Sequence, residues 1–288
     1  MLRVGHTGIT WGIPGDLVRA YTDVAALGYA GFETFGEAIE RFHDEQGDYR
    51  DLVRRCGIPT VAAYCWADWS SPASRAAEVA RVLHEARSLR HVGGETVVLA
   101  CGERPRPEGY TAAEFDRVAS ALMEVGTGCE KLGLRVGIHP HTGTGIETRD
   151  DIDTILTATA SSAVGFAPDS GQIAKGGSAV EEVFSSYADR ITHVHLKDWS
   201  GVTDYGPDGK ERDTTGYVNY VPIGDGILPI PELLSILDTA GFAGWVNVEL
   251  DGGLVPAPMP PREAAARSRQ YLQQVSSRTP APDPHYGL

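Results

Sequence analysis

Apolar positions along the chain follow two spacings, one typical of strands and one of helices. Short runs rich in β-branched residues, bounded by Gly, Pro or polar residues, predict strands near residues 2–6, 30–34, 58–63, 95–100, 134–139, 163–167, 191–196 and 244–249. Longer segments between several of these runs place apolar residues at helical spacing, namely 74–93, 111–133, 228–242 and 261–275. Strand and helix patterns therefore alternate along most of the chain.

End signals support these helices. Thr111 is followed three residues later by Glu114, which predicts a capping box, and Gly133 predicts the end of that helix. Gly93 and Gly241 predict the ends of two others, and prolines mark the start of the segment that begins at 228.

The alternation favours an α/β fold with a parallel sheet, and eight strand-plus-helix units in 288 residues predict a (β/α)8 TIM barrel. The rival is an open doubly wound sheet, which normally carries GxGxxG after its first strand; "GHTGITWG" lacks that spacing. We expect one barrel domain over residues 1–275 and a loosely held, proline-rich tail over 276–288. The stretch 199–222 is predicted to be a long loop of the lid or binding type.

Composition limits the possible partners. The formal net charge is −14 with no basic run, which argues against nucleic acid. No segment has the apolar length of a membrane span, and the N-terminus lacks a signal-peptide pattern, so a cytoplasmic protein without a membrane partner is expected. The four scattered cysteines are expected to be buried hydrophobes or free thiols.

Candidate chemistry collects where the later strands end. In "ITHVHLKDW", strand periodicity puts His193, His195 and Lys197 on one face and the apolar residues on the other. Carboxylates or imidazoles likewise end the second, fifth, sixth and eighth strands, at Glu33, His139 with His141, Asp169, and Glu249 with Asp251.

Because the carboxyl ends of barrel strands meet at one face, this convergence predicts a metal site there. Imidazole and carboxylate donors without thiolates suit Mn²⁺, Mg²⁺, Co²⁺ or Zn²⁺. Simpler interpretations stay open for each residue: the histidines as hydrogen-bonded core residues, Asp169 as a helix N-cap, Glu33 in a structural salt bridge. Four tryptophans follow strand ends and could either form an apolar wall for a sugar ring or pack in the core: Trp11, Trp66, Trp69 and Trp199.

Several motifs at these positions resemble the xylose isomerase-like TIM barrels, the sugar phosphate isomerase/epimerase superfamily. The likeness covers nearly the whole chain, through "GFET", "HPHTGTGIET", "PDSGQ", "THVHLKD" and "GWVNVEL". Within this superfamily, "HPHTGT", "HVHLKD" and "GDG" followed by a late strand that ends in Glu are most similar to the inosose dehydratases.

The resemblance implies one divalent metal ion near the barrel centre, with Mn²⁺ expected first and Co²⁺, Mg²⁺ or Zn²⁺ as alternatives. The family's ligands fall on Asp169, His195 and Glu249, with His139 where the family often has a glutamate. Gln172 stands where a histidine often follows the aspartate, and an amide supplies no titrating proton near neutral pH. Both departures leave open a non-catalytic sugar-binding barrel.

The function expected from this resemblance is proton abstraction next to a carbonyl of a small sugar or cyclitol. Dehydration of a keto-inositol-like substrate comes first; ketose isomerisation or epimerisation, and β-elimination from 3-keto-glycosides, are the alternatives. Glu249 or Glu33 is expected as the base and His141 or Lys197 as the proton donor, with substrate contacts from His193, Gln172, Trp11, Trp66 and Trp199. Barrels of this kind often form homo-oligomers, but the sequence leaves the oligomeric state open.

Overall fold

Eight parallel strands form one sheet in the computed structural model, which describes residues 2–12, 16–203, 219–251 and 259–275. The strands are β1 (Arg3–Thr7), β2 (Phe32–Phe35), β3 (Thr60–Ala67), β4 (Thr96–Cys101), β5 (Arg135–Ile138), β6 (Val164–Phe166), β7 (His193–Leu196) and β10 (Trp245–Val248). Their order is β6-β5-β4-β3-β2-β1-β10-β7. Isolated bridges from Phe166 to Ile191 and from Asp169 to His195 join β6 to β7 and close the ring. The predicted TIM barrel is confirmed.

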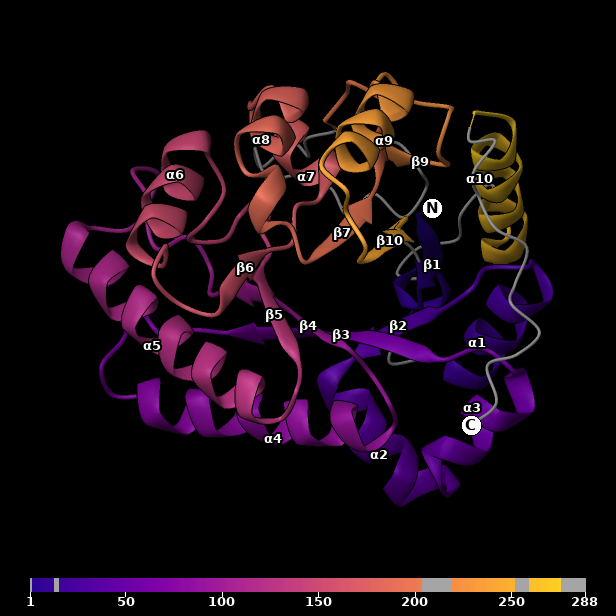
Figure 1. Ribbon diagram of the computed structural model, residues 1–288, viewed down its shortest axis with the longest axis horizontal. Coiled ribbons are helices and arrows are strands. Elements are labelled where there is room, and N and C mark those ends of the chain that lie inside the picture. The colour runs from indigo at the N-terminus through magenta and orange to yellow at the C-terminus, as the bar shows by residue number, and fades with distance from the viewer. Residues whose placement is uncertain (1, 13–15, 204–218, 252–258, 276–288) are drawn as a thin grey trace, which may run out of the picture.

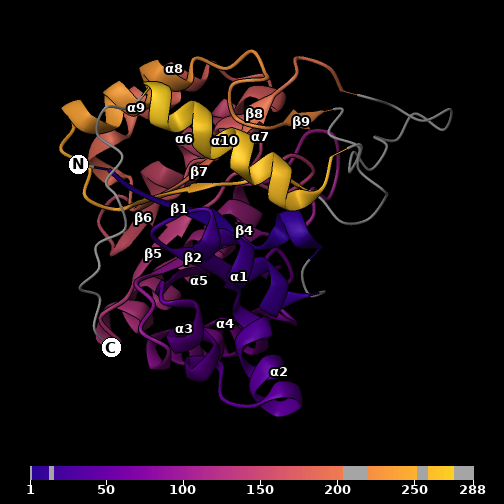
Figure 2. The same ribbon diagram turned by 90° about the vertical axis from the view of Figure 1, so that its right-hand side faces the viewer.

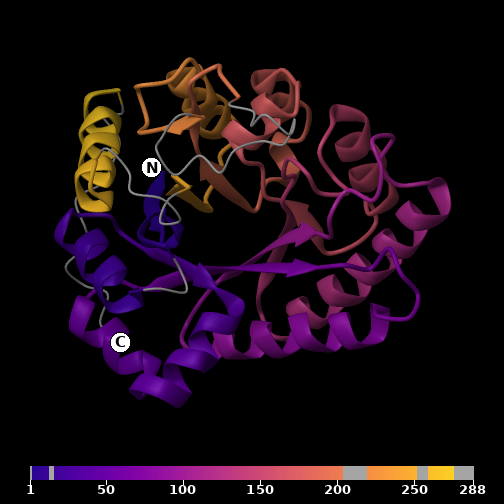
Figure 3. The ribbon, with the colours of Figure 1, turned by 180° about the vertical axis from the view of Figure 1, so that it is seen from behind.

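Helices surround the strands, as Figures 1 and 3 show from opposite sides. They are α1 (Leu17–Ala26), α2 (Gly36–Gln46), α3 (Tyr49–Cys56), α4 (Arg75–His91), α5 (Ala112–Lys131), α6 (Arg149–Ala158), α7 (Ser170–Lys175), α8 (Val180–Ser186), α9 (Ile230–Thr239) and α10 (Pro261–Val275), with 3-10 turns η1 (Ile9–Trp11) and η2 (Ala188–Arg190). The predicted capping box of Thr111 and Glu114 starts α5. The last helix, α10, packs against the first, α1, and crosses the strands in Figure 2.

The long predicted loop begins and ends as a small antiparallel ribbon. β8 (Asp198–Trp199) pairs with β9 (Tyr220–Val221), and residues 204–218 lie outside the described part of the chain. Asp198 fixes the turn that follows, because its carboxylate accepts hydrogen bonds from the backbone N–H groups of Gly224, Gly226 and Leu228. The expected tail, 276–288, also lies outside the described residues.

Three clusters of buried apolar residues build the core of the described chain, the smallest of them around Tyr220, Leu250 and Ala264. The largest fills the space between barrel and helices, and a smaller one inside the barrel contains Val98, Ala167 and Trp245. The amino-terminal end of the barrel is closed by Glu95, which accepts hydrogen bonds from Arg3, Arg135 and the Trp245 indole. All four cysteines are free, and three of them are buried. Among the described residues, no helix combines the length and apolarity needed to span a membrane.

Candidate metal centre

The carboxyl ends of four neighbouring strands bring together the polar residues singled out from the sequence. His139 follows β5, Asp169 follows β6, His195 lies on β7 and Glu249 follows β10. The bridge that closes the barrel joins Asp169 to His195, so closure of the ring itself sets this pair side by side. All four residues are buried.

Three of these side chains form a group of metal-ligand type. His139, Asp169 and His195 each offer one ligand atom, and the three atoms lie within 4.8 Å of one another. Within the described residues, the buried His139 Nε2 has no hydrogen-bond partner, whereas Asp169 Oδ2 and His195 Nδ1 face the charged groups of Lys197 and Glu249. Buried polar atoms are normally paired, so atoms left without such a partner mark a place where a ligand or ion belongs.

Glu249 and Lys197 border this group. Glu249 Oε2 lies 2.9 Å from His195 Nδ1, and Glu249 Oε1 lies 2.7 Å from the Lys197 ammonium. The same ammonium lies 3.1 Å from Asp169 Oδ2 and 3.1 Å from Asp251 Oδ2, with its Nζ 4.6 Å from the centre of the Tyr220 ring. Three carboxylates thus share one lysine cation, which leaves negative charge that a divalent cation would neutralise.

A second polar layer lies deeper in the barrel and is centred on Glu33 from β2. One carboxylate oxygen accepts from His195 Nε2 at 2.8 Å; the other accepts from His193 Nε2 at 2.8 Å and from Asn247 Nδ2 at 2.7 Å. Asn247 reaches this position because Gly5 lies opposite it on β1, where a Cβ atom would come within 2.2 Å of the Asn247 amide oxygen.

This layer orients His195. Its Nε2–H donates to Glu33 and its Nδ1 lies 2.9 Å from Glu249 Oε2, so a carboxylate faces each ring nitrogen. Burial opposes protonation, but Glu249 and then Glu33 raise the pKa of His195 well above its usual value, so an ion at Nδ1 would take the place of the second ring hydrogen. An imidazole whose outer N–H donates to a carboxylate is the usual arrangement for a metal-binding histidine. The donor set of imidazoles and carboxylates fits Zn²⁺, Mn²⁺, Co²⁺ or Mg²⁺.

Burial and neighbouring charges also shift the pKa values of His139, Glu33 and Glu249. Burial, followed by the nearby His195, lowers the pKa of His139 well below its usual value, so His139 is neutral and its lone pair is available. Burial alone would raise the pKa of Glu33, but His195 and then His193 hold that pKa well below its usual range. Burial likewise opposes ionisation of Glu249, yet His195 and Lys197 keep its pKa low. Both glutamates are therefore carboxylates at neutral pH.

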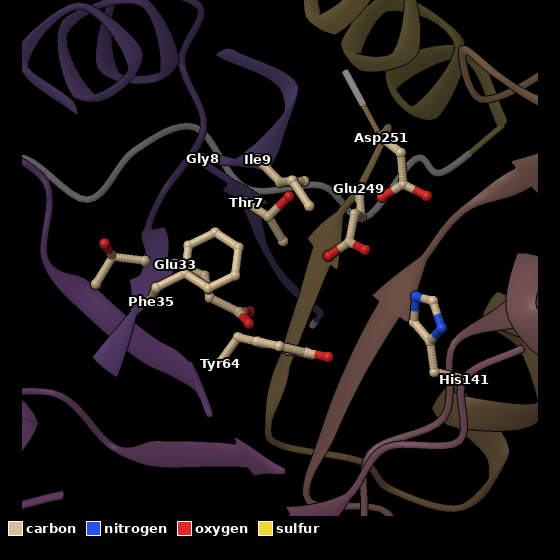
Figure 4. Close-up of a pocket in the computed structure, with 10 residues that line it drawn as sticks. Thr7, Gly8, Ile9, Glu33, Phe35, Tyr64, His141, Glu249 and Asp251 are labelled. Carbon is tan, nitrogen blue, oxygen red and sulfur yellow. The ribbon is translucent and has the colours of Figure 1, made fainter. Parts of the chain in front are cut away.

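A cleft of about 150 Å³ opens above these residues at the carboxyl end of the barrel. Figure 4 shows Glu249 and Asp251 on one side of the cleft and the Tyr64 side chain extending across it toward His141. Its lining residues come from the ends of β1, β2, β3, β5 and β10: Thr7, Gly8, Ile9, Glu33, Thr34, Phe35, Tyr64, His141, Glu249 and Asp251.

His141 and Gln172 hold each other at the side of the cleft. His141 Nδ1 lies 2.7 Å from the Thr142 carbonyl oxygen, and the Gln172 amide nitrogen lies 2.9 Å from His141 Nε2. The Gln172 carbonyl oxygen accepts from the Thr142 hydroxyl at 2.7 Å. Both nitrogens of His141 therefore have protein partners, with the ring hydrogen on Nδ1.

The family model for the xylose isomerase-like TIM barrel matches residues 21–275. The chain belongs to this family. The resemblance noted in the sequence is thereby confirmed.

Curated relatives of this barrel include inosose dehydratases. That of Lacticaseibacillus casei is 28% identical over 169 residues, which are 57% of this chain and 55% of the relative. That of Clostridium beijerinckii is 30% identical over 200 residues, 65% of this chain and 66% of the relative. The chain therefore spans less than two thirds of the length of these relatives. Among solved structures, an IOLI protein with a bound zinc atom matches with a TM-score of 0.75 and 16% identity, covering 97% of this chain and 100% of that one; this likeness shows the fold.

The three tryptophans expected at the substrate lie in different places on the xylose isomerase-like barrel. Trp11 is buried and its indole N–H donates to Asp23 at 3.0 Å, so it faces α1 and lines none of the described cavities. Trp199 donates to the Val202 carbonyl oxygen at 3.1 Å and is also absent from the cleft lining. Trp66 is 42% exposed and lines a separate cavity on the rim.

Tyr64 is a residue of the cleft that the sequence interpretation missed. On β3, Ala62, Tyr64 and Trp66 alternate with outward-facing residues, and the same two-residue period that revealed the histidines of β7 would have revealed Tyr64. Burial, followed by the Glu249 carboxylate, raises the pKa of Tyr64 well above its usual value. Its hydroxyl therefore remains protonated and can donate a hydrogen bond into the cleft.

Proposed function

We propose that the chain is a metal-dependent enzyme that removes a proton next to the carbonyl of a small cyclic keto-polyol, with dehydration of a keto-inositol-like substrate as its reaction. The group formed by His139, Asp169 and His195, with Glu249 beside it at the cleft, is the observation that carries this proposal. These four residues would hold the ion, with Mn²⁺ expected first. When bound, the ion would polarise the substrate carbonyl and stabilise the negative charge that develops on its oxygen.

In this proposal, residues of the chain serve as the general base and as the group that orients a ligand. Glu249 is ionised, contacts His195 of the metal-type cluster and lines the cleft, so in this scheme it accepts the proton from the carbon beside the carbonyl. Glu33 has both oxygens taken by three buried donors, which makes it an orienting carboxylate for His195 rather than the base.

Proton donation in this scheme falls to Tyr64. The nitrogens of His141 are paired with protein groups, and the Lys197 ammonium is shared among three carboxylates. As the C–H bond breaks, electrons form a C=C bond, the β-hydroxyl leaves, and the Tyr64 proton completes a water molecule. Glu249 then returns its proton to solvent, and Tyr64 is reprotonated from solvent.

Isomerisation or epimerisation of a ketose shares the first step and differs in where the proton returns. β-Elimination from a 3-keto-glycoside differs only in its leaving group, which is an alcohol instead of water. The similarity to inosose dehydratases supports placing dehydration first.

The test is incubation of the metal-loaded protein with 2-keto-myo-inositol in heavy water. We expect exchange of the proton beside the carbonyl by NMR and growth of enone absorbance. Exchange without an enone would assign isomerisation or epimerisation in place of dehydration. If neither exchange nor enone occurs with this or any other keto-sugar, the chain is a binding protein. In Glu249→Gln, both signals should disappear while the unfolding temperature stays close to that of wild type.

A further inference from the structure

A second cavity lies on the rim next to the cleft and has no part in the chemistry above. Its volume is about 360 Å³, more than twice that of the cleft. Phe35 and Tyr64 line both cavities, and their rings meet edge to face with centroids 5.5 Å apart. The two cavities therefore adjoin across this pair of rings, at the ends of β2 and β3.

The walls of this rim cavity combine aromatic and acidic side chains. Trp66 completes the aromatic side and leaves 42% of its surface exposed, which is unusual for a side chain of this size. Glu37 from α2 and Glu78 from α4 add carboxylates to the same lining. A flat apolar face beside hydrogen-bond acceptors is suited to a ring that carries hydroxyl groups.

The charge of the rim cavity selects against anions. Arg81 is the cation in its lining, and its guanidinium is bound by Glu78, Glu85 and the Trp66 carbonyl oxygen. Three carboxylates, from Glu37, Glu78 and Glu85, thus face one arginine that is already paired. A phosphate or carboxylate group would meet net negative charge and no unpaired cation among the described lining residues.

We infer that the rim cavity is a subsite for a second, uncharged ring joined to the keto-polyol ring in the cleft, so that the keto-inositol-like ring of the proposed function is one half of a two-ring, glycoside-like substrate. The inference rests on the proposed function, since the cleft is taken to hold the reacting ring. The reacting ring binds above the metal-type cluster, its substituent passes Phe35 and Tyr64, and the second ring lies on Trp66 with its hydroxyls toward Glu37 and Glu78. A free keto-cyclitol fills only the smaller cavity and is the poorer ligand.

Binding of unreactive glucosides tests this subsite without any chemistry. Calorimetric titrations compare methyl β-D-glucoside, phenyl β-D-glucoside and β-D-glucose 1-phosphate, which share the first ring and differ in the attached group. Burial of about 60 Å² of the phenyl ring corresponds to about tenfold in affinity. We therefore expect phenyl glucoside to bind about tenfold more tightly than methyl glucoside, and the phosphate to bind more weakly than either.

Variants test whether the difference in affinity between the two glucosides comes from Trp66. In Trp66→Ala the ratio between phenyl and methyl glucoside should fall to near one, whereas Trp66→Phe should keep most of it, which separates loss of a ring from loss of folding. Val18→Ala, at an apolar position 36% exposed on α1, is the matched control and should keep the full ratio. Equal affinities in wild type, a ratio that survives Trp66→Ala, tighter binding of the phosphate, or no binding of phenyl glucoside would each overturn the inference.

Failure of the subsite and failure of the proposed chemistry give different results. If keto-sugars exchange no proton but phenyl glucoside binds as expected, the proposed function fails and the subsite stands. The opposite result is equally clear. If methyl and phenyl 3-keto-β-D-glucoside exchange the proton at equal rates at low concentration, and methyl and phenyl β-D-glucoside bind with equal affinity, the subsite fails and the chemistry stands.

Discussion

Replacing Glu33 by Gln tests how the inner layer of the barrel prepares His195 for a metal ion. The glutamine side chain has the same shape but offers one acceptor and one donor where the carboxylate offers two acceptors. Its oxygen is best placed toward His193 and Asn247, which supply two of the three donors at 2.8 and 2.7 Å. The amide N–H₂ group then faces His195 Nε2, which must accept, so the single hydrogen of the neutral ring is held on Nδ1.

A hydrogen on Nδ1 blocks the atom that faces Asp169 and His139. Loss of such an orienting partner typically lowers metal affinity by about 10- to 100-fold, which is about 1.4 to 2.7 kcal/mol. Imperfect pairing of the buried donors should also lower the free energy of unfolding by about 1–3 kcal/mol. Calorimetric titration with Mn²⁺ and Zn²⁺ measures the first effect, and chemical denaturation of the metal-free protein measures the second.

Glu95→Gln is the matched control. Glu95 also accepts from three neighbours, Arg3, Arg135 and Trp245, but at the amino-terminal end of the barrel. This variant should lose stability and keep the wild-type metal affinity. Wild-type affinity in Glu33→Gln, or an equal loss in both variants, would refute the orienting role of Glu33.

Three further predictions concern other buried groups. His139→Ala should lower metal affinity by more than about 100-fold, because it removes a ligand itself and not only a residue that orients one. Metal content after dialysis measures this effect. An unchanged metal content would exclude His139 as a ligand. Burial, its largest cause, lowers the pKa of His6 to about 4 from 6.5, so the unfolded chain takes up a proton before the folded one. The contribution of neutral His6 to the free energy of unfolding is therefore complete above pH 6.5 and is lost as the pH falls to about 4, by up to about 3 kcal/mol. In His6→Gln, the free energy of unfolding should depend less steeply on pH over this range. An unchanged slope would contradict the reasoning. Asp23→Asn weakens the contacts of residue 23 with the Trp11 indole and with Arg262. The free energy of unfolding in urea should fall by only about 1 kcal/mol, because Arg262 is half exposed. An unchanged midpoint of unfolding would show that these contacts do not hold α10 to α1.

Much of the fold followed from periodicity alone. The eight predicted strands occur within a few residues of their expected positions because most of their residues are buried on both faces of a parallel barrel, which gives mainly apolar runs. The proximity expected for His139, Asp169 and His195 also followed, since parallel strands in a closed ring end at one face.

Features that depend on partners distant in sequence could not be predicted. Glu33 is bound by residues about 160 or more positions away, and nothing in its local pattern distinguishes an orienting carboxylate from a base. Trp11 faces Asp23 of α1, and its position after a strand does not reveal this contact. The β8–β9 pairing spans a segment with weak alternation, so it resembled an open loop.

Anomalous diffraction from crystals of the metal-loaded protein tests the central claim most directly. With Mn²⁺ or Zn²⁺, we predict one peak per chain at about 2.0–2.2 Å from His139 Nε2, Asp169 Oδ2, His195 Nδ1 and a Glu249 oxygen. No peak at this place, or a peak only among the surface histidines His43, His84 and His91, would contradict a metal centre at the mouth of the barrel and with it the proposed chemistry.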